Sequence, residues 1–344
     1  MRLFFHKLTH WEYWPFHVVY FPVFFLWAYY SIKARTIFFF SASNPGIKNS
    51  GFMAESKKEI HDIIPREYVP ITILIPEGST SDEVQSMLLH SAIKFPCIAK
   101  PDIGLRGSAV KKIESSKDLV DYNNKASFDY LIQDFIPFQK EVGIFYVRHP
   151  KQQAGRITGI VSKEFVIVTG DGVSTKAELV MKIPRYAFQL KNLQREYGDQ
   201  LNDVVPNGVK VNLVPYGNHV RGAKFLDASH RISDKLTNVM NEICIKIPGF
   251  YFGRLDIMYS SFDELEAGRN FLIVELNGAA SEPTHIYDPK HSIFFAWKEL
   301  FRHISIMNGI SAYNNKNGIP YLNYKEGMNE YRIHLAHNKK ILNF

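Results

Sequence analysis

The segments GRLDIMYS (253–260) and FLIVELNG (271–278) carry the strongest structural signal in the chain, because each places charged or polar residues inside an apolar run. Their β-branched and aromatic residues favour strands, and the polar sequence between them can close a hairpin. Side chains alternate between the two faces of a strand. We therefore expect Asp256, Glu275 and Asn277 to converge on one face of two adjacent strands.

The same alternation assigns the neighbours of these polar residues. Arg254 shares the face of Asp256, Ile273 is expected beside Glu275 and Asn277, and the core face is expected to hold Leu272, Val274 and Leu276. Two carboxylates on one face repel each other unless a cation lies between them. Mg²⁺ suits this set, because it binds through one or two carboxylates together with substrate phosphates. A solvated polar side of an amphipathic hairpin explains the same residues equally well.

Composition limits the possible functions. The 344 residues suffice for one large domain or two, and 46% hydrophobic with 22% charged residues is typical of a globular protein. The net charge of +7 suits phosphorylated substrates, nucleic acid or an anionic membrane. No run of five Lys or Arg occurs and strand-borne carboxylates repel phosphates, so we expect no nucleic-acid partner. Cys97 and Cys244 lie in apolar sequence, which favours buried free thiols in a reducing compartment.

The N-terminal forty residues are unusually apolar and aromatic. Trp14–Ile32 contains no Lys, Arg, Asp or Glu, and at ~1.5 Å per residue a helix of this length just spans a bilayer. Pro22 would kink such a helix, and Lys33 and Arg35 favour a cytoplasmic C-terminal side. An interfacial helix or hairpin, a buried core helix and, less favoured, a signal peptide remain open. We expect membrane association through residues 11–40, with the protein on the cytoplasmic side of the cell membrane, or in the cytoplasm if this segment is buried.

The rest of the chain mixes short strands and helices without internal repeats, which indicates an α+β fold, not a doubly wound parallel sheet. Strands are expected at 70–76, 95–101, 130–136, 140–150, 251–260 and 271–278, with a strand pair in 156–172. Helices are expected at 79–94, 115–126, 176–183, 233–247 and 292–307. Thr175 and Glu178 form a T-x-x-E capping box that begins one of these helices.

Lys100 ends an apolar strand immediately before a proline and a loop of small residues. A lysine in this position can place a point charge on a phosphate. The loop contains Gly104, Gly107 and Ser108, whose backbone N–H groups can approach phosphate oxygens. An ordinary turn between strands is the commoner explanation of such glycines.

The sequence YLIQDFIPFQKE (130–141) contains a candidate hinge. A strand ends near Ile136, a proline follows, and Glu141 begins the next strand. Extended backbone of this kind offers N–H and C=O groups to the edge of an adenine ring, and Glu141 could reach ribose hydroxyls. A plain connection between two strands is the alternative.

Together these three motifs, in this order, resemble the ATP-grasp superfamily, in particular its D-alanine–D-alanine ligase-like branch. GRLDIM, VELNG and DFIPFQKE are the most specific parts, and the resemblance covers roughly residues 55–289. It implies two α+β subdomains that clasp ATP. We expect a membrane-associating segment (1–43), a linker (44–56), an ATP-grasp domain (57–295), and a C-terminal helix and tail (296–344).

The resemblance also implies roles for individual residues. Arg254 and Lys100 would be catalytic. The residues expected to contact ATP are Lys57 (with Lys58 as the alternative), Lys100, Gly104, Gly107, Ser108, Asp134, Phe135, Ile136 and Glu141. The residues expected to bind Mg²⁺, with Mn²⁺ as the alternative ion, are Asp256, Glu275 and Asn277. Asn218, His219 and Arg221 would face the substrate, or bond locally within their loop.

The implied activity is that of an ADP-forming ligase, which activates a carboxylate as an acyl phosphate for attack by an amine. These ligases carry an N-terminal α/β domain that helps to bind the substrate, and here that position holds apolar sequence. The carboxylate and amine are therefore expected to be small molecules or envelope precursors, and the oligomeric state is open. The alternatives are an ATP-grasp tailoring enzyme that acts on cell-envelope glycan or lipid precursors, and a non-catalytic ATP-binding regulator.

Overall fold

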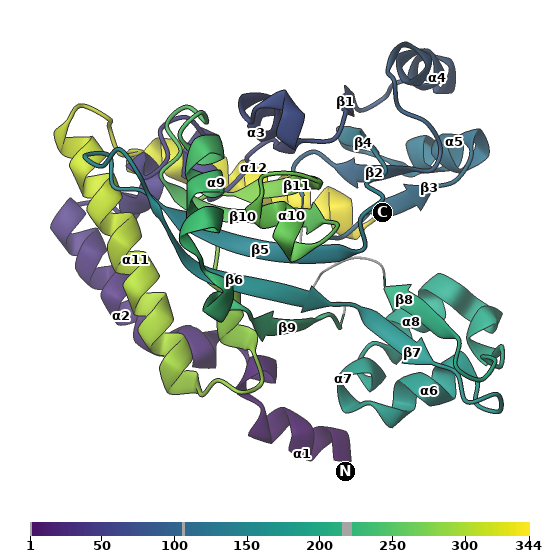
Figure 1. Cartoon of the computed structure of the whole chain (residues 1–344). Coiled ribbons are helices and arrows are strands. Elements are labelled where there is room, and N and C mark those ends of the chain that lie inside the picture. The colour runs from purple at the N-terminus through teal and green to yellow at the C-terminus, as the bar shows by residue number, and fades with distance from the viewer. Residues whose placement is uncertain (1, 105–106, 215–221) are drawn as a thin grey trace.

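The computed structural model describes residues 2–104, 107–214 and 222–344 (Figure 1). The helices of this part are α1 Arg2–Thr9, α2 Phe16–Ala34, α3 Lys57–Ile63, α4 Ser81–His90, α5 Ser116–Lys125, α6 Lys176–Lys182, α7 Pro184–Ala187, α8 Leu190–Tyr197, α9 Asp234–Cys244, α10 Phe262–Glu266, α11 Ile293–Lys316 and α12 Tyr324–Leu342. The strands are β1 Thr72–Ile75, β2 Cys97–Pro101, β3 Lys111–Ile113, β4 Tyr130–Asp134, β5 Lys140–Val147, β6 Arg156–Glu164, β7 Val166–Thr169, β8 Lys210–Val214, β9 Lys224–Asp227, β10 Phe252–Tyr259 and β11 Phe271–Asn277.

The strands form three antiparallel sheets, which confirms the predicted α+β class. Their orders are β1-β4-β2-β3, β11-β10-β5-β6-β9 and β7-β8. The predicted strand pair in 156–172 is wrong as a pair: β6 joins β5 and β9, whereas β7 joins β8 in a separate sheet. The chain changes sheets at Phe165, and β7 and β8 pack with α6 and α8 around a separate core of Val, Leu and Tyr side chains.

The five-stranded sheet is covered on both faces. Even-numbered residues of β5, such as Ile144, pack with α9 in the largest core cluster. Odd-numbered residues, such as Phe145, pack against Phe39, Phe40 and α11. A sheet buried on both faces can hold charged side chains only where each one is paired with an opposite charge or hydrogen-bonded. At one end of this sheet, charged residues of β5, β6 and β10 form ion pairs with one another.

The N-terminal segment packs on the domain. Figure 1 shows α2 beside α11, and the indole Nε1 of Trp297 donates to the carbonyl of Val19 at 2.8 Å. Asn44, in the segment predicted as a linker, is buried and donates from Nδ2 to the carbonyl of Phe252 at 2.8 Å. Within the described ranges, no helix combines the length and the hydropathy needed to cross a membrane.

Candidate functional site

Strands β10 and β11 align their polar residues as the alternation of the sequence predicts. Arg254 lies opposite Asn277, and Asp256 lies opposite Glu275. A β-bulge follows, so that Ile257 pairs with Ile273 and Val274 is skipped. The expectation that Ile273 shares the face of Glu275 is therefore wrong.

The bulge also changes which apolar residues of β11 reach the core. Ile273 is fully buried among core side chains with Leu276, whereas Leu272 and Val274 are only partly buried. Strict alternation predicted that Leu272 and Val274 would face the core and that Ile273 would not. An extra residue in one strand reverses the facing of everything on one side of it, and this reversal lets β11 present Glu275 without losing its core contact.

Asp256 is the centre of the charged group on this face, and it is only 4% exposed. Arg254 donates to both of its oxygens, from Nε to Oδ1 at 2.8 Å and from Nη2 to Oδ2 at 3.1 Å. Lys163 Nζ lies 3.4 Å from Oδ2. Burial opposes the carboxylate charge, but Arg254 and Lys163 outweigh it and hold the pKa of Asp256 below its ordinary value.

Lys163 on β6 is a site residue that the sequence reasoning missed. It lies opposite Glu141 in the β5–β6 register and forms an ion pair with that carboxylate, and its side chain is only 5% exposed. Glu141 and Asp256 together raise the pKa of Lys163 against the opposing effect of burial. Gly143 faces Asp256 across the strands, and a Cβ there would lie 3.0 Å from Oδ1. The glycine therefore provides the space for this group of charges.

Lys57 comes to the same face from the first turn of α3. Its Nζ lies 3.2 Å from Oε1 of Glu275, and this carboxylate raises the pKa of Lys57 despite partial burial. Lys58 points elsewhere and binds Asp62 on its own helix at 2.6 Å. A Cβ on Gly104 would lie 2.6 Å from Lys57 Nζ, so the start of the small-residue loop closes over this ammonium group.

Lys100 is buried between the four-stranded sheet and β11. Its Nζ donates to Oε1 of Gln133 at 3.0 Å and to the carbonyl of Val274 at 3.4 Å. Burial lowers the pKa of Lys100 to about 8, and the attraction of Glu275 offsets only part of that effect. The ammonium thus lies beside the backbone of the bulge, one residue from Glu275, with no carboxylate in direct contact among the described residues.

The candidate adenine residues are not joined to this charged group by any contact within the described ranges. Asp134 ends β4, and Phe135 is 40% exposed with Lys112 Nζ 5.0 Å from its ring centre. Ile136 is buried. Glu141, five residues further on, is the one member of the predicted hinge that an ion pair links to Asp256, through Lys163.

The candidate phosphate loop is only partly described. Gly104 lies beside Lys57, whereas Gly107 and Ser108 follow the two residues, 105 and 106, that lie outside the described ranges. Three residues expected to face the substrate lie outside the described residues: Asn218, His219 and Arg221.

The set Asp256, Glu275 and Asn277 matches the oxygen ligands that Mg²⁺ prefers. Nδ2 of Asn277 is buried and has no hydrogen-bond partner among the described residues. The described residues contain no group of three His, Cys, Asp or Glu that could hold a metal by themselves. A Mg²⁺ ion would therefore need phosphate or water oxygens in addition, and it would share Asp256 with Arg254.

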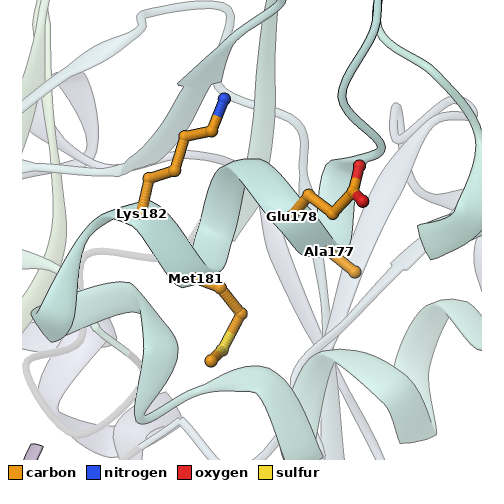
Figure 2. Close-up of a pocket in the computed structure, with 4 residues that line it drawn as sticks. All are labelled: Ala177, Glu178, Met181 and Lys182. Carbon is orange, nitrogen blue, oxygen red and sulfur yellow. The ribbon is translucent and has the colours of Figure 1, made fainter.

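Two hollows differ in their relevance to this group. A narrow cavity lies between α3, the four-stranded sheet and β11 of the five-stranded sheet. Its lining is Lys57, Ile60, His61, Ile64, Lys100, Leu131, Ile273, Val274, Glu275 and Leu276. A wider hollow is lined by four residues of α6 alone, Ala177, Glu178, Met181 and Lys182 (Figure 2). Lys182 is already paired with Asp171 at 2.7 Å. A single helix face of this kind offers no converging groups, whereas the narrow cavity brings together Lys57, Lys100 and Glu275.

Comparisons with known proteins give structural similarity only. No family model matches the chain, and no curated protein matches its sequence. Among solved structures, it is similar to a bifunctional glutathione synthetase from Pasteurella multocida (TM-score 0.38, 13% identity), covering 72% of this chain and 36% of the other. VanG D-Ala:D-Ser ligase from Enterococcus faecalis (TM-score 0.42, 12% identity) is covered over 61% of its length, with 73% of this chain aligned.

A third similar structure is the D-alanine–D-alanine ligase from Bacillus anthracis, with a TM-score of 0.42 and 13% identity over 76% of this chain and 69% of that one. This chain thus spans about a third to two thirds of the length of the structures reported first.

Proposed function

We propose that this protein is an ATP-dependent, ADP-forming ligase that activates a carboxylate as an acyl phosphate for attack by an amine. One observation carries the proposal: a partly buried face where oppositely charged side chains from β2, β5, β6, β10, β11 and α3 converge. Its cations are Lys57, Lys100, Lys163 and Arg254. Its carboxylates are Glu141, Asp256 and Glu275.

The charge of this face suits a nucleotide that brings its own metal. Four cations and three carboxylates leave one net positive charge. Lys57 and Lys100, on either side of Glu275, can turn to phosphate oxygens, since ammonium groups act as mobile point charges. Asp256, Glu275 and Asn277 would hold Mg²⁺. When bound, the ion offsets the repulsion between the phosphates and an incoming carboxylate.

The reaction then needs positioning and charge compensation more than proton transfer. A substrate carboxylate oxygen attacks the γ-phosphorus, the bond to the β-γ bridging oxygen breaks, and ADP leaves. The amine nitrogen next attacks the acyl carbon, phosphate leaves, and the amine proton passes to solvent or phosphate. Arg254 donates to Asp256 and to the carbonyl of Glu282 at 3.3 Å, and in this mechanism it would stabilise the charge at the acyl centre.

The order of motifs in the sequence supports the same activity, since it resembles the D-alanine–D-alanine ligase-like branch of the ATP-grasp superfamily. The apolar segment 11–40 supports a location on the cytoplasmic side of the cell membrane. That location favours an envelope glycan or lipid precursor as the second candidate substrate class. A non-catalytic regulator is disfavoured, because the full set of Lys100, Arg254, Asp256, Glu275 and Asn277 is present, which argues against a site that has lost its chemistry.

The test is release of ADP from Mg²⁺-ATP by the full chain against a matrix of carboxylic acids and amines. We expect a carboxylate-dependent and amine-dependent signal that Asp256→Asn and Glu275→Gln abolish while both variants remain folded. Undiminished turnover in either variant would sink the proposal. Binding of ATP with no ADP from any pair, envelope precursors included, would favour the regulator.

A further inference from the structure

Helix α2 has an unusual exposed face. Val19 and Val23 turn inward toward α11. The opposite arc is exposed and apolar, and it consists of Val18, Phe21, Phe24, Phe25, Tyr29 and Ile32, from 43% to 79% exposed. A helix that is apolar on its buried and its exposed side needs a second apolar environment, because a contiguous aromatic face in water is costly.

Helix α11 continues this surface. Trp297 ties the two helices together through Val19, and its ring packs edge-on against Phe294 at 5.5 Å between centroids. Phe294 is 73% exposed, and Phe301 follows two turns later at 36%. The two helices therefore present one surface, the α2–α11 face, composed of the six exposed apolar residues of α2 together with Phe294 and Phe301.

The fixed charges beside this face are positive. No Asp or Glu occurs between Glu12 and Glu55, whereas Lys33 and Arg35 are exposed at the end of α2. On α11, Lys298 is exposed as well, and Glu299, the one acidic residue of that helix, is buried. Anionic headgroups can neutralise such cations anywhere along the face, whereas a protein partner would have to place its own carboxylates at matching points.

The same helix touches the candidate active site. Tyr20, on the flank of α2, donates a hydrogen bond from its hydroxyl to the carboxylate of Glu282. The carbonyl of Glu282 accepts from Nη1 of Arg254 at 3.3 Å. Tyr20 of α2 and Arg254 thus contact the same residue, Glu282, so the position of α2 is linked to the position of Arg254.

We propose that the α2–α11 face docks, with α2 lying in the plane of the surface, on an anionic lipid bilayer, so that the membrane lies next to the Arg254 end of the active site. Aromatic side chains enter the boundary between headgroups and acyl chains, and Lys33, Arg35 and Lys298 pair with lipid phosphates. The inference concerns binding alone, and it stands or falls separately from the ligase activity.

The test is co-sedimentation of the purified full chain with vesicles of phosphatidylglycerol and phosphatidylcholine, compared with phosphatidylcholine alone. We expect binding to the anionic vesicles that weakens as salt is raised. The double substitution Phe21→Ser and Phe25→Ser should lower it ~10-fold or more, since two apolar side chains no longer leave water. The matched control, Leu89→Ser with Leu342→Ser, alters two residues that are 84% and 69% exposed on other helices and should leave binding unchanged.

The charge contribution has its own pair of variants. Lys33→Gln with Lys298→Gln should weaken binding to anionic vesicles several-fold, at about 1 kcal/mol per cation near the surface. Lys111→Gln with Lys191→Gln, which removes two exposed lysines elsewhere, should not. Equal losses of vesicle binding in the test and control pairs overturn the proposal, because binding would then depend on net charge or on nonspecific adsorption.

Two other results also overturn it. Absence of vesicle binding, with ADP formation intact, rejects the docking face and leaves the ligase standing. Self-association in light scattering that Phe21→Ser with Phe25→Ser abolishes, without vesicle binding, assigns the face to a second copy of the chain instead. Vesicle binding without any ADP formation would keep this inference and count against the ligase.

Discussion

Asp256→Asn should destabilise the protein by about 3 kcal/mol, because it leaves a buried cation without its partner. The four charges in contact here are Arg254, Lys163, Asp256 and Glu141, which sum to zero, and the side chains of Lys163 and Asp256 are 5% and 6% exposed. Removing one carboxylate leaves a net charge of +1 in a place that water barely reaches. The loss lies at the lower end of the range for buried pairs, since Lys163 keeps Glu141.

Chemical denaturation followed by circular dichroism measures this loss. The matched control is Glu264→Gln, which breaks an ion pair with Arg269 at 3.0 Å, where the two side chains are 31% and 66% exposed. Surface pairs of this kind contribute little, so the control should unfold with the wild type. A second variant, Arg254→Met with Asp256→Asn, restores a net charge of zero and should recover part of the stability. The reasoning fails if Asp256→Asn unfolds like the control, or if the two substitutions in the double variant simply add their losses.

Three further predictions follow from the described contacts. ATP affinity should fall as pH rises from 7 to 9, because Lys100, with a pKa of about 8, loses its proton. The variant Lys100→Arg should bind ATP with the same affinity across this range. If its affinity falls with pH as steeply as that of the wild type, Lys100 does not bind the phosphates. The free energy of unfolding should fall as pH drops from 6.5 to about 4, by up to about 3 kcal/mol per histidine. Burial lowers the pKa of His61 and of His303 to about 4, so only the unfolded chain binds these protons in that window. A constant free energy of unfolding across this range would contradict the prediction. Gly143→Ala should cost about 1–3 kcal/mol, since its Cβ would meet Val161 at 2.8 Å, and unchanged denaturation midpoints would show that the strands adjust freely.

The strands that carry the candidate site could be predicted from the sequence because local alternation determines them. The pairing of Asp256 with Glu275 required only two strands and a hairpin. The β-bulge at Val274 could not be predicted, because it depends on how Ile273 and Leu276 fit the core. A single inserted residue leaves no mark in the composition of an apolar strand.

Lys163 was missed for a related reason. A lysine near the end of a strand normally reaches solvent, and only the register of β6 against β5 places it opposite Glu141. The available signal was the period of two: Lys163 lies on the same face of the strand as Gly159 and Val161, and both of these are buried. Pairing between β5 and β6 is non-local information, as is the partition of β6 and β7 into different sheets.

For the N-terminal segment, the sequence predicted the apolar character of a helix but not which of its faces is buried. Its apolar composition predicted burial or membrane contact, and both remain consistent with the described residues, since Val19 and Val23 are buried while Phe25 and Ile32 are exposed. Composition cannot divide a helix that is apolar all round into two faces. That division needed the position of α11.

Calorimetry of ATP binding, with and without Mg²⁺, tests most directly whether the β10–β11 face is a Mg²⁺-ATP site. The account predicts that the wild type binds ATP much more tightly with Mg²⁺ than without it, and that Glu264→Gln behaves in the same way. Glu275→Gln should lose the Mg²⁺-dependent part of the affinity while its denaturation midpoint shows that it is folded. Equal Mg²⁺-dependent binding in Glu275→Gln and the wild type would contradict the assignment of this face.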